Sequence, residues 1–117
     1  MNIPAKDYLE MIKGKKKPSK YRSTRVECDG IKFQSKLEAN YFTELKLQHK
    51  MGCIAGFGRQ IRFPLGAGVE YVADFVVWGL DGVAEVVECK GFLTDVAAVK
   101  LKFFQDKYPM IKLTVER

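Results

Sequence analysis

The chain has 117 residues, enough for a single domain, and 47% of them are hydrophobic, so it can bury a substantial core. Its 20 Lys and Arg outnumber its 14 Asp and Glu, which favours a polyanionic partner. No apolar run is long enough for a membrane span or a signal peptide. Three cysteines without a CxxC pair argue against a disulfide framework and a structural zinc site. We therefore expect a soluble cytoplasmic domain.

The positive charge is concentrated near the N-terminus. Seven basic residues and no acid fall within residues 13–25, which leaves 13 basic and 14 acidic residues in the rest of the chain. Gly, Pro and Ser interrupt this basic arm, so we expect a mobile segment that can neutralise DNA phosphates. A purely solubilising tail is an equally good interpretation. The basic residues are Lys13, Lys15, Lys16, Lys17, Lys20, Arg22 and Arg25.

The first half of the chain predicts helices around a hairpin. Residues 3–12 fit a short helix that precedes the basic arm. The Asp29-Gly30 pair, between two short alternating runs, predicts a β-hairpin. Ser35 is then expected to cap a helix of about 15 residues that Gly52 ends.

The second half predicts strands around one more helix. Short strands are expected at 54–57 and 60–65, the second ended by Pro64 and the Gly66-Ala67-Gly68 turn, and stronger strands at 69–78 and 83–90. A helix is expected at 95–107 and a last strand at 111–115. The strand–helix–strand unit at the end requires a parallel, right-handed crossover, whereas the earlier strands are closely connected and should be antiparallel. This αβββαβ order predicts an α/β fold with a mixed sheet flanked by helices.

Three charged residues interrupt the strongest strands. Asp74 lies within an apolar strand, and Glu88 and Lys90 lie near the end of the next one. Side chains two positions apart on a strand share a face, so Glu88 and Lys90 should point the same way. Buried charges are costly unless they are compensated. In the simplest interpretation they are solvated residues at a strand end, with Asp74 paired to Lys90.

The turn between these strands decides whether the carboxylates meet. A three-residue loop, Leu80-Asp81-Gly82, places Asp74 directly opposite Glu88, about 5 Å away, where like charges repel. Mg²⁺ or Mn²⁺ would remove this repulsion, because both prefer oxygen ligands. Without the ion, at least one carboxylate should have a raised pKa. A two-residue loop would instead shift the register by one and place the carboxylates on opposite faces.

The spacing of these residues resembles the bipartite D-(x)n-(D/E)xK motif of the PD-(D/E)xK nuclease superfamily, with Ala73 in place of the proline. More closely, residues 26–115 are similar to small phage-encoded endonucleases described as Holliday-junction resolvases. The matching segments are VECDGIKFQSKLEANYF, YVADF and VVECKGFLTD. This resemblance implies a restriction-endonuclease-like core over residues 26–117, preceded by an N-terminal helix and basic arm over residues 1–25.

The resemblance also implies further site residues. Glu38 occupies the acidic position of the family's first helix and would be a metal ligand, although Ser35 and Glu38 also form a capping box in which Glu38 reaches back to the Ser35 backbone. Gln60 matches a glutamine often found near such sites; otherwise it is a polar residue at a strand edge. The Cys89 carbonyl would complete the metal ligands, while its side chain points into the core as a small hydrophobe.

The implied activity is Mg²⁺- or Mn²⁺-dependent hydrolysis of DNA, with Asp74 and Glu88 holding the ion and Lys90 positioning or deprotonating the attacking water. The expected substrate is branched DNA, and symmetric cutting of a junction predicts a homodimer. Such an enzyme would act in DNA recombination, in the cytoplasm of a bacterial host, without a small-molecule cofactor. The alternatives are a nuclease of the same fold acting on other DNA structures, a non-catalytic DNA-binding module that uses the basic arm, and a structural phage protein.

Overall fold

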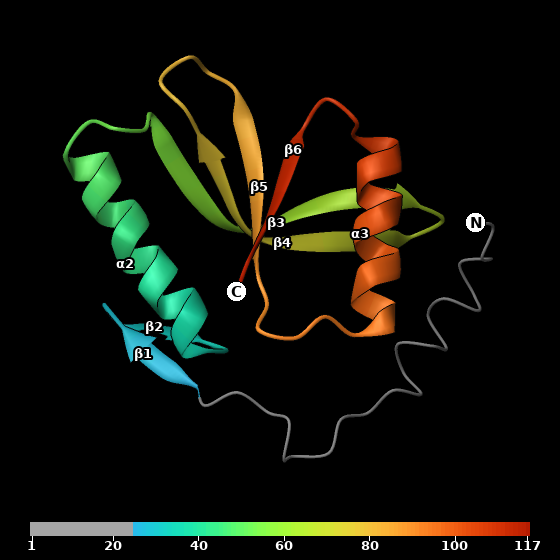
Figure 1. Cartoon of the computed structure of the whole chain (residues 1–117), viewed down its shortest axis with the longest axis horizontal. Coiled ribbons are helices and arrows are strands. Elements are labelled where there is room, and N and C mark those ends of the chain that lie inside the picture. The colour runs from blue at the N-terminus through green and yellow to red at the C-terminus, as the bar shows by residue number, and fades with distance from the viewer. Residues whose placement is uncertain (1–24) are drawn as a thin grey trace.

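The computed structural model describes residues 25–117, and its elements follow the predicted order (Figure 1). The strands are β1 (Val26–Cys28), β2 (Ile31–Phe33), β3 (Gly56–Gly66), β4 (Val69–Trp78), β5 (Ala84–Cys89) and β6 (Lys112–Glu116), and the helices are α2 (Lys36–Lys50) and α3 (Asp95–Lys107). The predicted helix at 3–12 and the basic arm up to residue 24 lie outside the described residues.

The main sheet has the strand order β3-β4-β5-β6. β3, β4 and β5 are antiparallel neighbours, whereas β6 pairs with β5 in parallel after the α3 crossover. Both directions were predicted, and the described part of the chain is an α/β fold with a mixed sheet. The predicted hairpin of β1 and β2 is also present, with positive φ at Asp29 and Gly30.

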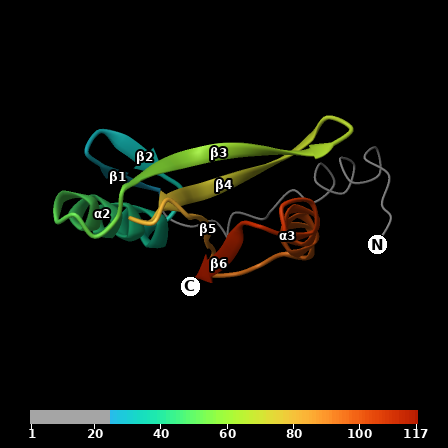
Figure 2. The same ribbon diagram turned by 90° about the horizontal axis from the view of Figure 1, so that it is seen from above.

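The helices pack on opposite faces of the sheet. Val87 and Cys89 belong to the buried cluster under α2, whereas the intervening position of β5, like Val86, faces the cluster under α3. Figure 2, in which β5 and β6 are seen almost end-on, shows α2 and α3 on either side of them. Each helix begins with a capping side chain: Ser35, as predicted, accepts a hydrogen bond from a helix N–H at α2, and Thr94 does so at α3.

β3 and β4 form one long ribbon that bends near its middle (Figure 1). On β4, Tyr71 and Ala73 pack in the cluster under α3, but Phe75 and Val77 pack in the cluster under α2. Alternate residues of a regular strand share one face. The face of β4 therefore changes between Ala73 and Phe75, which is the position of Asp74.

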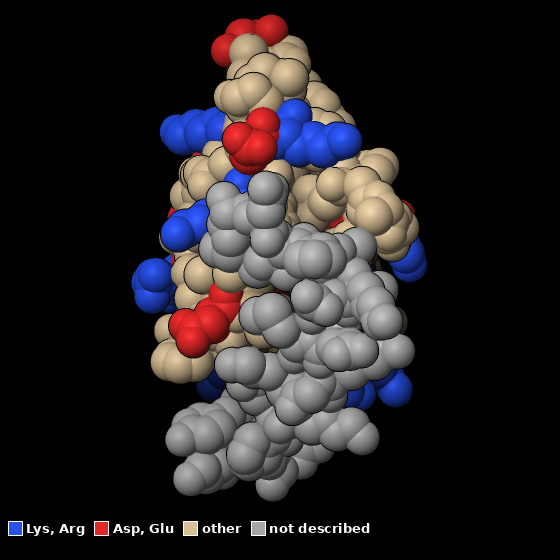
Figure 3. Space-filling model, turned by 90° about the vertical axis from the view of Figure 1, so that its right-hand side faces the viewer, with Lys and Arg blue, Asp and Glu red and all other residues tan. Residues whose placement is uncertain are grey.

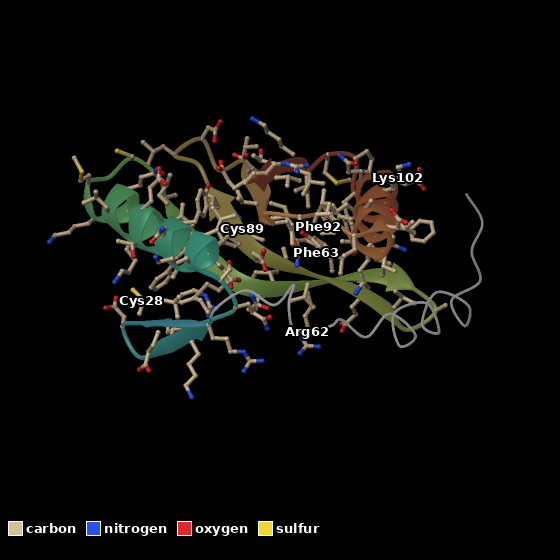
Figure 4. The ribbon with its side chains drawn as sticks, turned by 60° about the horizontal axis from the view of Figure 1, so that its bottom comes forward. Cys28, Arg62, Phe63, Cys89, Phe92 and Lys102 are labelled. Carbon is tan, nitrogen blue, oxygen red and sulfur yellow. The ribbon has the colours of Figure 1, made fainter. Side chains whose placement is uncertain are left out.

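The prediction of two short strands was wrong, because β3 continues through residues 58–59 and through Pro64, and it ends at the predicted Gly66-Ala67-Gly68 turn. β3 is an edge strand, so a missing N–H on its outer side breaks no ladder hydrogen bond. The carbonyl of Pro64 accepts a 2.7 Å hydrogen bond from Tyr108. Figure 4 shows Phe63 pointing from β3 toward α3 and Arg62 pointing away from it. Among the described helices, none has the length and apolarity needed to cross a bilayer.

Candidate functional site

Asp74 lies opposite Glu88 at the bend of the sheet. The β4–β5 ladder pairs Trp78 with Ala84 and continues to Phe75 with Val87, so the next pair in register is Asp74 and Glu88. The register follows from the predicted three-residue loop, in which Gly82 has a φ of 83°. The loop is closed by a 3.0 Å hydrogen bond from the Gly79 N–H to the Val83 carbonyl.

The Asp74 carboxylate shows the expected repulsion. Burial, and then the nearby charge of Glu88, raise the pKa of Asp74 to about 7. A 2.9 Å hydrogen bond from the Cys89 N–H to Asp74 Oδ2 acts in the opposite direction, and so does the charge of Lys90. These groups relieve only part of the repulsion, and the site therefore favours an additional positive charge.

Glu88 is buried and is held from two sides. The Tyr71 hydroxyl donates a 2.5 Å hydrogen bond to Oε1, and Lys90 Nζ lies 3.7 Å from Oε2. Glu88 and Lys90 thus share a face, as predicted. Tyr71 was missed in the sequence, since an aromatic residue in an apolar strand is typical of a core and nothing marks its hydroxyl as part of a site.

Glu38 is buried in the first turn of α2. Its predicted roles are a partner in the helix cap and a ligand of the metal. Its N–H donates to Ser35 Oγ, as in a capping box. Its Oε1 accepts a 3.1 Å hydrogen bond from the Gln34 N–H, not from the Ser35 backbone as predicted. Glu38 Oε2 accepts a 3.3 Å hydrogen bond from Gln60 Nε2, and the charge of Glu38 raises the pKa of Asp74. Glu38 therefore caps α2 and also faces the carboxylate pair.

Gln60 has an unusual backbone conformation. Its φ is 53°, in the left-handed region that costs a non-glycine residue roughly 1–2 kcal/mol. The β3–β4 ladder pairs the residues on either side of it, Arg59 with Phe75 and Ile61 with Ala73, so Gln60 lies opposite Asp74. This places the strained residue at the bend and directs its amide to Glu38. Strain at such a position is common in functional sites.

The side chain of Cys89 packs in the core, as predicted, and its backbone N–H donates to Asp74, whereas the role of its carbonyl as a metal ligand stays a prediction. The side chain is buried in the cluster under α2 (Figure 4). Burial, together with the charges of Asp74 and Glu38, raises the pKa of its thiol to about 12. A thiol in this state is not a nucleophile near neutral pH.

Lys100, on α3, is a second cation that the sequence did not single out, since a lysine on a helix is typically solvated. Burial lowers its pKa, while the charges of Glu88 and Glu70 act in the opposite direction and Lys90 acts in the same direction as burial. Lys100 is therefore close enough to Glu88 to be influenced by its charge. Lys90, directly after β5, thus contacts Glu88, and Lys100 on α3 lies within the range of its charge.

The residues at the bend fit a divalent cation that is also bound by its substrate. Within residues 25–117, no three Asp, Glu, His or Cys side chains already form a metal-binding group. Mg²⁺ is usually held by one or two carboxylates together with substrate phosphates and water, so Asp74 and Glu88 meet its need for protein ligands. The observation that supports this fit is the pair of adjacent carboxylates, one half-buried on Asp74 and one buried on Glu88, with the charge of Glu88 raising the pKa of Asp74.

The predicted DNA-binding residues lie almost entirely outside the described part of the chain. Of the basic residues singled out in the arm, only Arg25 is described, and it is exposed just before β1. On the face of the molecule seen in Figure 3, basic and acidic side chains are interspersed where residues are described. That face therefore carries no surface of a single charge sign in its visible described part.

Comparison with known proteins gave one result. In searches of curated proteins and of solved structures, no match to this chain was found. A family model matches residues 18–117, which is most of the chain and includes every described residue of the site. The chain therefore belongs to the family described as "Protein of unknown function (DUF1064)".

Proposed function

We propose that this protein is a metal-dependent endonuclease that hydrolyses phosphodiester bonds in DNA, built on a restriction-endonuclease-like core. The proposal rests on one observation: Asp74 and Glu88 face each other across β4 and β5, with Lys90 3.7 Å from Glu88. The order α2-β3-β4-β5-α3-β6 agrees with the αβββαβ core of that superfamily. A binding module has no use for paired carboxylates, since they repel phosphate.

The side chains divide the work of hydrolysis. Asp74, Glu88 and the Cys89 carbonyl would hold Mg²⁺ or Mn²⁺, which supplies a polarised water and offsets charge in the transition state. Lys90 donates hydrogen bonds from a partly exposed ammonium group, so it can orient the attacking water and offset negative charge on the phosphate. Tyr71 fixes one oxygen of Glu88 and leaves the Lys90 side of the carboxylate available. Glu38 and Gln60 form an outer pair that adds negative charge beside Asp74.

The substrate we propose is branched DNA such as a four-way junction. The sequence supplies a basic arm for the phosphate backbone. Cutting two strands of a junction symmetrically requires two sites related by a two-fold axis, so a homodimer is part of the proposal. It would act in the bacterial cytoplasm, in recombination of DNA.

The test is cleavage of a labelled four-way junction and of a linear duplex of the same sequence, with Mg²⁺, Mn²⁺ or EDTA. Paired nicks in the junction alone, with either metal, are expected from the wild-type protein. Equal cutting of both substrates would support the nuclease activity but contradict the proposed preference for a junction. Tight binding without cutting would favour the non-catalytic DNA-binding module.

Three variants make this test specific for the site. Asp74→Asn and Glu88→Gln keep the size of each side chain and should abolish cleavage while DNA binding is retained or tightened. Asp106→Asn is the matched control, because Asp106 is an exposed acid on α3. It lies eleven residues after Asp95, the first residue of the helix, which is about 16 Å along the helix axis. Cleavage by either site variant at the wild-type rate would reject the assigned site.

A further inference from the structure

Phe92 is the most exposed large apolar side chain of the described residues, with 76% of its surface accessible. It lies in the loop between β5 and α3, which joins the end of the site strand to the helix carrying Lys100 (Figure 4). Isolated exposed apolar residues are ordinary on protein surfaces. The place of Phe92, rather than its exposure alone, is what requires an explanation.

The loop that carries Phe92 is short and is fixed at both ends. At one end, the Lys90 N–H donates a 2.9 Å hydrogen bond to the Glu116 carbonyl on β6. At the other end, Thr94 Oγ1 accepts a 3.1 Å hydrogen bond from the Ala97 N–H and caps α3. Leu93, between them, packs in the cluster under α3. The neighbours of Phe92 are thus anchored, and its ring is held outside the core.

The backbone of Phe92 is also near the carboxylate pair along the chain. Phe92 follows Lys90 by two residues and Glu88 by four, so its Cα lies within about 7 Å of the first and about 14 Å of the second. A phosphate bound at the site has its own nucleotides within that range. The carboxylates, through a metal ion, and the lysines would contact the phosphate, and the exposed ring of Phe92 supplies an apolar face for a base.

We propose that Phe92 stacks on an unpaired nucleobase next to the phosphate that a metal ion held by Asp74 and Glu88 would bind. This inference rests on the proposed nuclease function and names the feature of DNA that the site prefers. Aromatic side chains bind any unstacked base through its face, independently of sequence. The bases of a continuous duplex are stacked on each other, whereas a branch point offers bases that can leave the stack. Phe92 is therefore the residue that favours branched DNA over duplex.

Binding is measured first with Ca²⁺ in place of Mg²⁺ and with the carboxylate pair intact, by fluorescence anisotropy on a four-way junction and on a linear duplex. Phe92→Ala should weaken junction binding about tenfold, with a much smaller effect on the duplex. Phe92→Tyr keeps an aromatic face and should restore junction binding. Leu80→Ala is the matched control, since Leu80 is 70% exposed but lies in the β4–β5 loop at the opposite end of β5.

A double-mutant cycle then identifies the base. Single abasic nucleotides are placed around the position at which the wild-type protein cuts. At one abasic position, the protein with Phe92 intact should lose as much affinity as Phe92→Ala loses on the intact junction. Combining this abasic position with Phe92→Ala should cause no further loss. Additive losses at every position would overturn the proposed stacking.

The remaining outcomes separate this inference from the function it rests on. If the wild-type protein cuts neither substrate with Mg²⁺ or Mn²⁺, the nuclease proposal fails and the inference fails with it. If the wild-type protein cuts DNA and Phe92→Ala binds the junction equally well, only the inference fails. It also fails if Phe92→Ala weakens binding to both DNAs equally and changes the sedimentation coefficient, since Phe92 would then be a contact between two copies of the chain.

Discussion

The hydroxyl of Tyr71 donates a 2.5 Å hydrogen bond to the buried carboxylate of Glu88. The ring that carries this hydroxyl is fixed by aromatic neighbours, with Phe63 6.3 Å and Phe104 5.0 Å away between ring centroids. The packing of α3 on the sheet is thus linked directly to the orientation of one carboxylate. Glu88 cannot turn within the site unless this hydrogen bond breaks.

We expect Tyr71→Phe to raise the Mg²⁺ concentration needed for cleavage, with a smaller effect on the free energy of unfolding. Phe keeps the ring packing but leaves Glu88 Oε1 without its donor, and loss of such an outer partner typically costs 10–100-fold in metal affinity or activity. The Mg²⁺ concentration that gives half-maximal cleavage should rise by about that factor. Tyr108→Phe is the control, because it removes a similar hydrogen bond, to the Pro64 carbonyl, away from the site. An unchanged Mg²⁺ requirement in Tyr71→Phe would contradict the positioning role.

The stability of the metal-free protein should depend on the protonation of Asp74. Its pKa is raised from 3.8 to about 7 on folding, so the folded state favours the protonated acid. The stability it contributes is fully present below pH 4 and is lost as the pH rises to about 7. Asp74→Asn cannot ionise and should not show this loss. The melting temperature of the variant minus that of the wild type should therefore increase between pH 4.5 and pH 7.5, and a constant difference would exclude the raised pKa.

Metal without DNA should stabilise the wild-type protein, and more so at higher pH. An ion bound only by the folded state adds about 1.4 kcal/mol at ten times its dissociation constant, and binding requires the ionised form of Asp74. Mn²⁺ should thus raise the melting temperature by several degrees at pH 8 and by less at pH 5. Asp74→Asn and Glu88→Gln should lose this increase, and Asp106→Asn should keep it. An equal increase in all four proteins would show that Mn²⁺ binds elsewhere.

Variants of Gln60 separate the cost of its strained backbone from the function of its side chain. Gly adopts its φ of 53° without cost, whereas Ala keeps the strain and lacks the amide that donates to Glu38. We expect Gln60→Gly to be more stable than Gln60→Ala by about 1 kcal/mol, as measured by urea unfolding. Both variants should cleave DNA more slowly than the wild type, because Glu38 loses a hydrogen bond in each. A wild-type rate in both would limit Gln60 to a structural role.

The register of the site could be predicted from the sequence because it depends on a short loop. Gly82 permits the positive φ of a three-residue turn, and the pairing of Asp74 with Glu88 follows by counting along the two strands. The roles of Tyr71 and Lys100 depend on tertiary packing. In the sequence, Tyr71 is an ordinary residue of a core strand and Lys100 an ordinary residue of a helix surface, and neither pattern indicates a function. The unbroken β3 was missed because the predicted strands stopped on either side of Gly58 and Arg59. Pro64 was expected to help end the second strand, but a missing N–H is tolerated at the sheet edge, and that position is known only from the fold.

The basic arm should contribute to DNA binding and not to the chemical step. Replacing Lys15, Lys16 and Lys17 by Gln should weaken binding and make it less sensitive to salt, lowering the slope of log K against log [salt] by about three. The cleavage rate at saturating DNA should change little, because the carboxylate pair is unaltered. The matched control replaces three exposed lysines of the described residues, Lys102, Lys107 and Lys112, and should leave the slope closer to that of the wild type. A reduced rate at saturating DNA together with an unchanged slope would place the arm in the catalytic step or in folding, against its proposed role as a phosphate-binding segment.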